Sequence, residues 1–131
     1  MGAVPWQYEV VRWDGVASAR CVTLTPIGRI HDWDQKPVET CVADLDAILR
    51  EVPLEVPAID RHKFDSFTCR TWFRAAIREL NKRGKYVQCP NVDAFEERLT
   101  RIATAIELIN RQYGRSSTQI MKAIREATPW P

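Results

Sequence analysis

The sequence predicts an α+β protein, in which a short antiparallel β portion is followed by three to four packed α-helices. Residues 6–13 read WQYEVVRW and residues 19–30 read ARCVTLTPIGRI. Both runs are rich in aromatic and β-branched residues, which is typical of strands. After residue 40 the apolar residues recur at helical spacing instead. Strands that precede helices along the chain indicate the α+β class.

The two extended runs are expected to pair as an antiparallel hairpin. Asp14-Gly15, a frequent turn dipeptide, lies between them, and residues 16–18 separate it from the second run. Because two strands do not form a stable sheet by themselves, something else must complete it. We expect either further strands in the proline-rich stretch that follows or a second copy of the chain, which would make the protein a homodimer.

Two helices are expected in the middle of the chain. The first covers residues 40–52 and stops at Pro53, because proline cannot continue a helix. The second begins at a cap formed by Ser66 or Thr68 and runs to about residue 83. Gly84 follows it, at the position of a left-handed C-cap. Its apolar stripe consists of Cys69, Trp72, Phe73, Ala76, Ile77 and Leu80.

Two further helices are expected in the last third of the chain. Asn91 is suited to cap a long helix over residues 92–113, and Gly114 ends it. A short last helix follows from Ser116 or Ser117 to about residue 127.

The composition predicts one globular domain over residues 1–131. The chain is 45% hydrophobic and 27% charged, which excludes wholesale disorder. Its 19 basic and 17 acidic residues give a net charge of +2, so a highly charged nucleic-acid binder is excluded. No apolar run approaches the roughly 18 residues of a membrane helix. The first residues lack the pattern of a signal peptide, which predicts a cytoplasmic protein that does not bind membranes.

The four cysteines are expected to be reduced thiols. Cys21, Cys41, Cys69 and Cys89 are widely spaced, and no pair forms a C-x-x-C motif. Disulfides are disfavoured in the cytoplasm. We therefore expect no metal site and no cofactor, and three of these cysteines, all except Cys69, are interpreted as structural.

Cys69 is the candidate nucleophile. A thiol in the first turn of a helix lies at the positive end of the helix dipole, and Arg70 beside it adds positive charge. Such a cysteine works with a histidine base, and the candidates are His31 and His62. The alternative is structural, because Cys69 also belongs to the apolar stripe and a buried cysteine there needs no function.

Two other groups of residues are candidates for binding. The loop residues His31, Asp32, Trp33 and Asp34 combine an imidazole, an indole and two carboxylates, and we expect them to contribute to a ligand site with Trp72 and Arg70. A basic ridge recurs every four residues on the Cys69 helix, and it consists of Arg70, Arg74, Arg78 and Lys82. This ridge either binds an anionic partner or is the solvated back of an amphipathic helix.

The Cys69-Arg70-Thr71-Trp72 segment resembles the Cys-x-x-Trp helix of a group of small, uncharacterised fungal proteins. Arg74, Leu80 and the strand-like residues 6–9 fit the same pattern, and the resemblance covers about residues 6–110. It implies a distant similarity to a permuted NlpC/P60-like, papain-like thiol fold. Longer members carry a Tyr-His-Trp element, which neither histidine of this chain reproduces. The presumed catalytic base of the family is therefore missing.

These observations predict a small-molecule-binding or auxiliary domain, with a pocket between residues 6–30 and the Cys69 helix. The resemblance extends this to a small apolar substrate that is cyclised or isomerised in fungal specialised metabolism. One alternative is a thiol-dependent hydrolase or acyltransferase that uses Cys69. A second alternative is a protein–protein interaction module. The sequence leaves open whether the protein is an enzyme.

Overall fold

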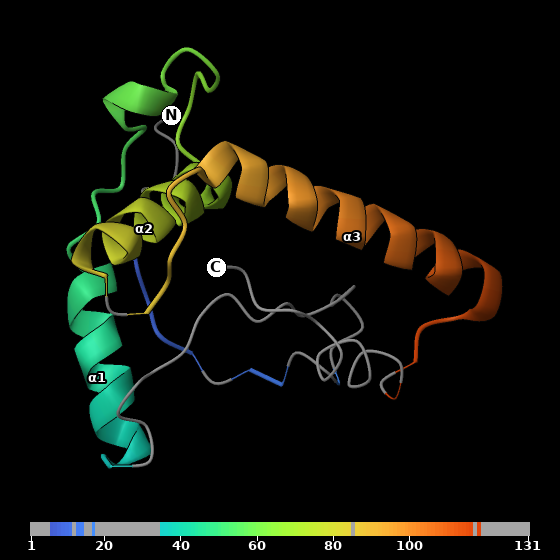
Figure 1. Ribbon diagram of the computed structural model, residues 1–131, viewed down its shortest axis with the longest axis horizontal. Coiled ribbons are helices and arrows are strands. Elements are labelled where there is room, and N and C mark those ends of the chain that lie inside the picture. The colour runs from blue at the N-terminus through green and yellow to red at the C-terminus, as the bar shows by residue number, and fades with distance from the viewer. Residues whose placement is uncertain are drawn as a thin grey trace, which may run out of the picture. The chain divides into compact units, whose positions relative to one another are not determined.

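The computed structural model describes residues 6–11, 13–14, 17, 35–84, 86–116 and 118. Figure 1 shows its elements in chain order, namely α1 (Val38–Leu49), the short 3₁₀ turn η1 (Ala58–Asp60), α2 (Cys69–Arg83) and α3 (Val92–Tyr113). The chain forms two compact units, Met1–Val11 with Arg29–Val87 and Arg12–Gly28 with Gln88–Pro131. The first unit holds α1, η1 and α2, and the second holds α3. The single domain stays a prediction.

The predicted α+β class is wrong, because the described part of the chain contains three helices and no strand. Residues 6–11 have a strand-like composition but form no regular element. Their aromatic rings pack on aromatic residues instead: Trp6 contacts Phe67 edge-on at 5.5 Å between ring centroids, and Tyr8 lies 5.9 Å from Trp72. Strand propensity measures how well a side chain fits a half-buried surface, and here Phe67 and Trp72 provide such a surface in place of a sheet.

Two predicted elements fall where the structure gives no description. The second extended run, residues 19–30, lies outside the described residues. The same holds for the last predicted helix, apart from positions 116 and 118.

The predicted boundaries of α2 are confirmed. The helix begins after Thr68, whose extended backbone has φ −142° and ψ 174°. The Thr71 hydroxyl accepts a hydrogen bond from the Thr68 backbone N–H at 2.9 Å, which satisfies a donor at the helix start. Gly84 ends the helix in the left-handed conformation, and Lys82 and Arg83 in the last turn suit the negative end of the dipole.

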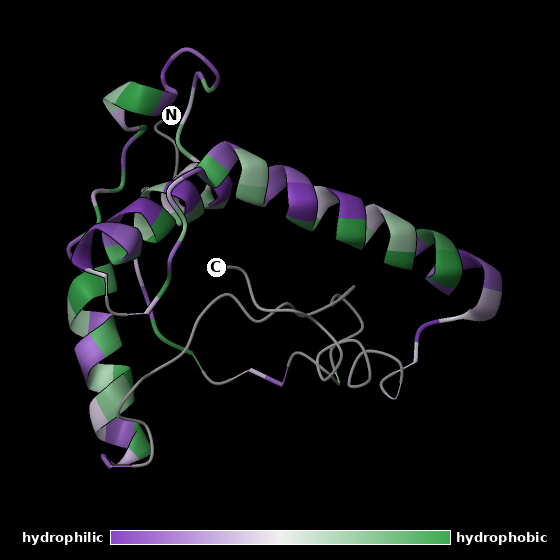
Figure 2. Ribbon diagram, in the orientation of Figure 1, coloured by the Kyte–Doolittle hydropathy of each residue, from purple (hydrophilic) through white to green (hydrophobic). Residues whose placement is uncertain are grey.

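A side-chain cap starts α3, whereas α1 starts without one. The backbone N–H of Ala94 donates to Asn91 Oδ1 at 3.0 Å, so the predicted cap of α3 is confirmed. Along α3, hydrophobic and hydrophilic residues alternate (Figure 2), as expected for a helix with one apolar face. The bounds predicted for the first helix, residues 40–52, are wrong: α1 begins at Val38, directly after Pro37, and ends at Leu49, three residues before the predicted end.

The buried apolar residues of the first unit come mainly from α2. Ala76, Ile77 and Leu80 are buried on this helix, and their spacing is that of the predicted apolar stripe. The other buried apolar residues of this unit are Cys41, Val52 and Val87. Asp60, Thr71 and Arg74 are also buried, so polar groups form part of this interior.

Replacing Gly84 with alanine is expected to lower the free energy of unfolding by about 1 kcal/mol. Gly84 has φ +68°, and a Cβ atom there would meet no atom within 4 Å. The loss therefore comes from backbone strain and not from a clash. Urea denaturation followed by circular dichroism measures it. Gly84→Asn is the control and should cost less, because asparagine tolerates the left-handed region. Equal stability of Gly84→Ala and the parent chain would contradict this reasoning.

Candidate functional site

Two arginines of α2 converge on one buried carboxylate. Arg78 binds Asp60 through both terminal nitrogens, at 2.6 Å to Oδ2 and 2.8 Å to Oδ1. Arg74 donates to Oδ1 from Nη2 at 3.0 Å and from Nε at 3.3 Å. Asp60 is 0% exposed and Arg74 1% exposed, whereas the Arg78 side chain keeps 27% of its surface in solvent. This three-residue ion cluster joins η1 to α2.

The local fold brings Asp60 to this position. Pro57 has φ −61° and directly precedes η1, and the backbone N–H of Asp60 donates to the Pro57 carbonyl at 2.9 Å. Arg74 and Arg78 are four residues apart, so they lie on the same face of α2. The two arginines hold the pKa of Asp60 at about 2, below its ordinary value of 3.8, with the Arg78 hydrogen bond as the main cause. Asp60 is therefore ionised at neutral pH.

An aromatic ring supports the same cluster. The guanidiniums of Arg70 and Arg74 both lie over the Phe64 ring. Their Cζ atoms are 4.8 Å and 5.3 Å, respectively, from the ring centroid. Both distances are within the range of a cation–π interaction. The Phe64 backbone N–H donates to the Asp60 backbone carbonyl at 3.0 Å, which ties the two residues together through the main chain.

Neither interpretation of the basic ridge describes these arginines fully. Arg74 is buried, so the ridge is not a solvated helix face, and the acid that it meets precedes α2 in the chain. Arg70 and Lys82 are exposed, as a solvated face requires.

An aromatic pocket lies at the start of α2. Its volume is about 210 Å³, and it is lined by Trp6, Gln7, Tyr8, Glu9, Leu54, Phe67, Cys69 and Trp72. The N-terminal segment forms one wall, and α2 with the residue before its cap forms another. We call this the aromatic pocket.

The N-terminal wall of the aromatic pocket is anchored to α1 through Tyr8. Its hydroxyl donates to Asp46 Oδ1 at 2.7 Å, and Arg50 both pairs with Asp46 at 3.1 Å and lies 5.4 Å from the Tyr8 ring centroid. Partial burial, reinforced by the hydrogen bond to Asp46, raises the pKa of Tyr8, and the same hydrogen bond lowers the pKa of Asp46. The anchor therefore keeps the tyrosine neutral and the aspartate charged.

One polar group in a wall residue of this pocket has no partner. The indole N–H of Trp72 is buried and makes no hydrogen bond. A buried donor without an acceptor costs about 1–3 kcal/mol, so such groups are uncommon in native proteins.

The structure brings two of the predicted site residues, Cys69 and Trp72, together in the aromatic pocket. Cys69 is an exposed free thiol, so its interpretation as a buried core residue is wrong. Cys41 and Cys89 are buried, as predicted. Arg70 is exposed and contacts Phe64.

No histidine in the described part of the chain is hydrogen-bonded to the Cys69 thiol. His62 is exposed and has no hydrogen bond to Cys69 among the described residues. The loop residues His31, Asp32, Trp33 and Asp34, as well as Cys21, lie outside the described residues. Their predicted roles stay predictions.

Sequence reasoning missed Asp60, Phe64 and Tyr8. No motif marks Asp60, and its partners are 14 and 18 residues away in the chain. The only usable signal was the four-residue spacing of the arginines, which shows a shared face but not what the face meets.

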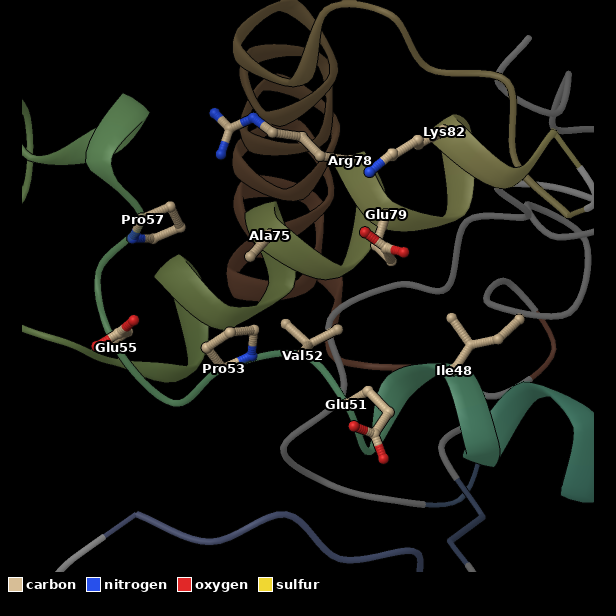
Figure 3. Close-up of a pocket in the computed structure, with 10 residues that line it drawn as sticks. All are labelled: Ile48, Glu51, Val52, Pro53, Glu55, Pro57, Ala75, Arg78, Glu79 and Lys82. Carbon is tan, nitrogen blue, oxygen red and sulfur yellow. The ribbon is translucent and has the colours of Figure 1, made fainter.

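A second pocket of about 360 Å³ lies between α2 and the segment that leaves α1 (Figure 3). Its lining residues are Ile48, Glu51, Val52, Pro53, Glu55, Pro57, Ala75, Arg78, Glu79 and Lys82. We call this the charged groove.

Neither a metal cluster nor a membrane helix is found in the part of the chain that the structure describes. No group of three or more histidine, cysteine or acidic side chains is arranged there to hold a metal ion. None of the helices in the described ranges combines the length and hydropathy needed to cross a bilayer.

Comparisons with protein-family models, with curated proteins and with solved structures found no match. The resemblance to the fungal proteins and to the NlpC/P60-like fold therefore stays a prediction that rests on the short motifs quoted above.

Proposed function

We propose that this protein binds a small, flat, apolar molecule in the aromatic pocket. The observation that carries the proposal is the convergence of four aromatic side chains, from Trp6, Tyr8, Phe67 and Trp72, around one opening. Aromatic side chains supply a large apolar surface and stack on planar ligands. Pockets lined mainly by such residues, with few polar groups, are typical of ligand sites.

The size of the pocket limits the ligand. Its volume of about 210 Å³ is below the roughly 300–1,000 Å³ of drug-sized sites. A single aromatic ring or a short branched hydrocarbon suits this space, whereas a nucleotide or a haem is too large.

The Trp72 indole N–H is expected to favour ligands that carry a hydrogen-bond acceptor. Because this N–H is buried without an acceptor, a ligand whose hydroxyl or carbonyl oxygen reaches it would gain a hydrogen bond. We therefore expect phenols or small carbonyl compounds to bind better than hydrocarbons of the same shape. Cyclisation or isomerisation of such a ligand in specialised metabolism rests on the resemblance alone.

Nuclear magnetic resonance tests this function. Phenol, indole and toluene are titrated into the full chain, and the indole N–H signals are followed. We expect saturable shifts of the Trp6 and Trp72 signals, with phenol binding more tightly than toluene. Trp72→Phe keeps a ring and removes the N–H, so it should weaken phenol binding about fivefold.

Trp13 provides the control for this titration. It is 62% exposed and does not line the aromatic pocket, so Trp13→Phe should leave phenol binding unchanged. Shifts of equal size at all indole signals, or no saturation, would contradict the proposal.

The exposed Cys69 thiol in the pocket wall favours one alternative, a thiol-dependent hydrolase or acyltransferase. Cys69→Ser separates the two functions. Unchanged phenol binding with no loss of turnover of an activated ester supports simple binding. Loss of ester turnover in Cys69→Ser, together with a covalent adduct on Cys69 in the parent chain, supports the thiol enzyme.

A further inference from the structure

The charged groove has one wall on α2 and a second wall on the segment after α1 (Figure 3). Figure 3 shows Arg78, Glu79 and Lys82 on the helix, with Glu51 and Glu55 on the opposite segment. All of these residues belong to the first unit. The groove is therefore formed within one compact body, and its lining shares no residue with the aromatic pocket.

The α2 wall carries two cationic side chains, Arg78 and Lys82, that can still bind an acceptor. Arg78 shares the Asp60 carboxylate with Arg74. Arg78 is the member of this ion cluster that borders the groove. It uses two of the five N–H donors of a guanidinium on Asp60, so three remain for another acceptor. Lys82, one turn later, lines the groove and is in no ion pair within the described residues.

The opposite wall carries negative charge that is likewise available to a ligand. Glu51 and Glu55 are exposed, and neither is in an ion pair within the described part of the chain. The third acid of the groove, Glu79, differs, because Arg83 binds its carboxylate at 3.0 Å. The carboxylates that remain available thus lie across the groove from the available cations.

Apolar surface separates the two charged walls. It is formed by Ile48, Val52, Pro53, Pro57 and Ala75, and Val52 is buried. Arg78 is held rigidly by two short hydrogen bonds, so little side-chain entropy is lost when it binds a ligand. The volume of about 360 Å³ lies at the lower end of the range of small-molecule sites.

We propose that the charged groove binds a small zwitterion with an apolar body, namely a hydrophobic amino acid or dipeptide. The ligand carboxylate binds Arg78 and Lys82, its ammonium group faces Glu51 and Glu55, and its side chain covers the apolar surface between them. This site does not depend on the function proposed for the aromatic pocket.

Isothermal titration calorimetry of the full chain tests this with four probes. Leucine carries both charges, isocaproate lacks the ammonium group, isopentylamine lacks the carboxylate, and leucyl-leucine is the dipeptide. We expect millimolar binding of leucine. Isopentylamine should bind at least about tenfold more weakly, because charge-assisted hydrogen bonds to Arg78 are lost. Isocaproate should bind about fivefold more weakly. The ratio of leucine to leucyl-leucine binding shows which of the two zwitterions fits.

Two variants test which side chains bind the carboxylate and the ammonium group of leucine, and neither changes a residue of the ion cluster. Lys82→Glu should weaken leucine binding at least about fivefold and leave isopentylamine binding no weaker. Glu51→Gln with Glu55→Gln should reduce leucine binding to the level of isocaproate. Arg101→Glu makes the same charge change as Lys82→Glu at an exposed position of α3 and should have no effect. Circular dichroism confirms that each variant is folded.

Absence of saturable leucine and leucyl-leucine binding up to about 20 mM, well above the expected dissociation constant, would overturn the proposal. So would equal binding of leucine and isopentylamine, because a zwitterion site must discriminate between them. Trp72→Phe should leave leucine binding unchanged, so failure of the aromatic pocket and failure of this groove are separate results.

Discussion

Asp60→Asn is expected to lower the free energy of unfolding by about 3–5 kcal/mol. Asparagine has nearly the same shape, but it removes the negative charge that the guanidiniums of Arg74 and Arg78 share. Arg74 is 1% exposed, so water cannot replace the lost carboxylate, and removing one partner of a buried ion pair is strongly destabilising. Because small domains are stable by only about 5–15 kcal/mol, this single change is expected to bring the chain close to unfolding. Urea denaturation at neutral pH measures the loss.

Asp44→Asn is the matched control for this substitution. Asp44 pairs with Lys36 at 3.4 Å, and both side chains are more than two-fifths exposed. Exposed pairs of this kind contribute about 0–1 kcal/mol, so the control should be nearly as stable as the parent chain. If Asp60→Asn and Asp44→Asn had equal stabilities, the buried cluster would not have the role assigned here.

A double variant separates buried charge from lost packing. Replacing Asp60 with leucine and Arg74 with methionine removes both buried ions and keeps apolar volume. Exchange of a buried ion pair for apolar residues is often nearly neutral. The double variant is therefore expected to be more stable than Asp60→Asn, even though it carries one more substitution.

The boundaries of α2 and the start of α3 could be predicted from the sequence because they depend on local chemistry. The α2 start at Thr68, its end at Gly84 and the α3 cap at Asn91 involve groups within four residues of one another. Hydrogen bonds and backbone preferences at this range are visible in the order of the residues. The same reasoning found the apolar stripe that contains Ala76, Ile77 and Leu80.

The absence of a strand over residues 6–11 could not be predicted, because strand formation depends on a distant partner. The segment has the right side chains for a strand, yet Tyr8 is held by Asp46, 38 residues away. Aromatic residues that suit a sheet face also suit contact with the rings of Phe67 and Trp72. Composition alone does not separate these two environments.

The candidate site was predictable only in part. Cys69 and Trp72 were singled out and do share a pocket. The exposure of Cys69 was not predictable, because residues at the start of a helix can lie beside its core stripe or at its solvent edge. Asp60 was missed for a different reason, since an isolated acid in a turn looks like any solvated carboxylate until its arginine partners are known.

Lowering the pH from 5 to 2 is expected to remove about 2 kcal/mol of stability through Asp60 alone. The pKa of this carboxyl is about 2 in the folded chain and 3.8 ordinarily. The unfolded chain therefore takes up a proton at a higher pH than the folded chain, and acid favours unfolding. The contribution is complete above about pH 5 and decreases steadily as the pH approaches the folded value. Asp46, whose pKa is also lowered, acts in the same direction.

Arg78→Gln distinguishes the Asp60 contribution from general acid unfolding. Hydrogen bonding to Arg78 is the main cause of the low pKa of Asp60, so this variant should move that pKa toward its ordinary value and make the stability curve less steep between pH 5 and 2. Lys82→Gln removes the same charge one turn later without touching Asp60, and its curve should follow that of the parent chain. Urea midpoints at several pH values, with carboxyl carbon resonances to assign the proton, measure both effects. Parallel curves for Arg78→Gln and the parent chain would mean that another carboxylate controls the acid sensitivity.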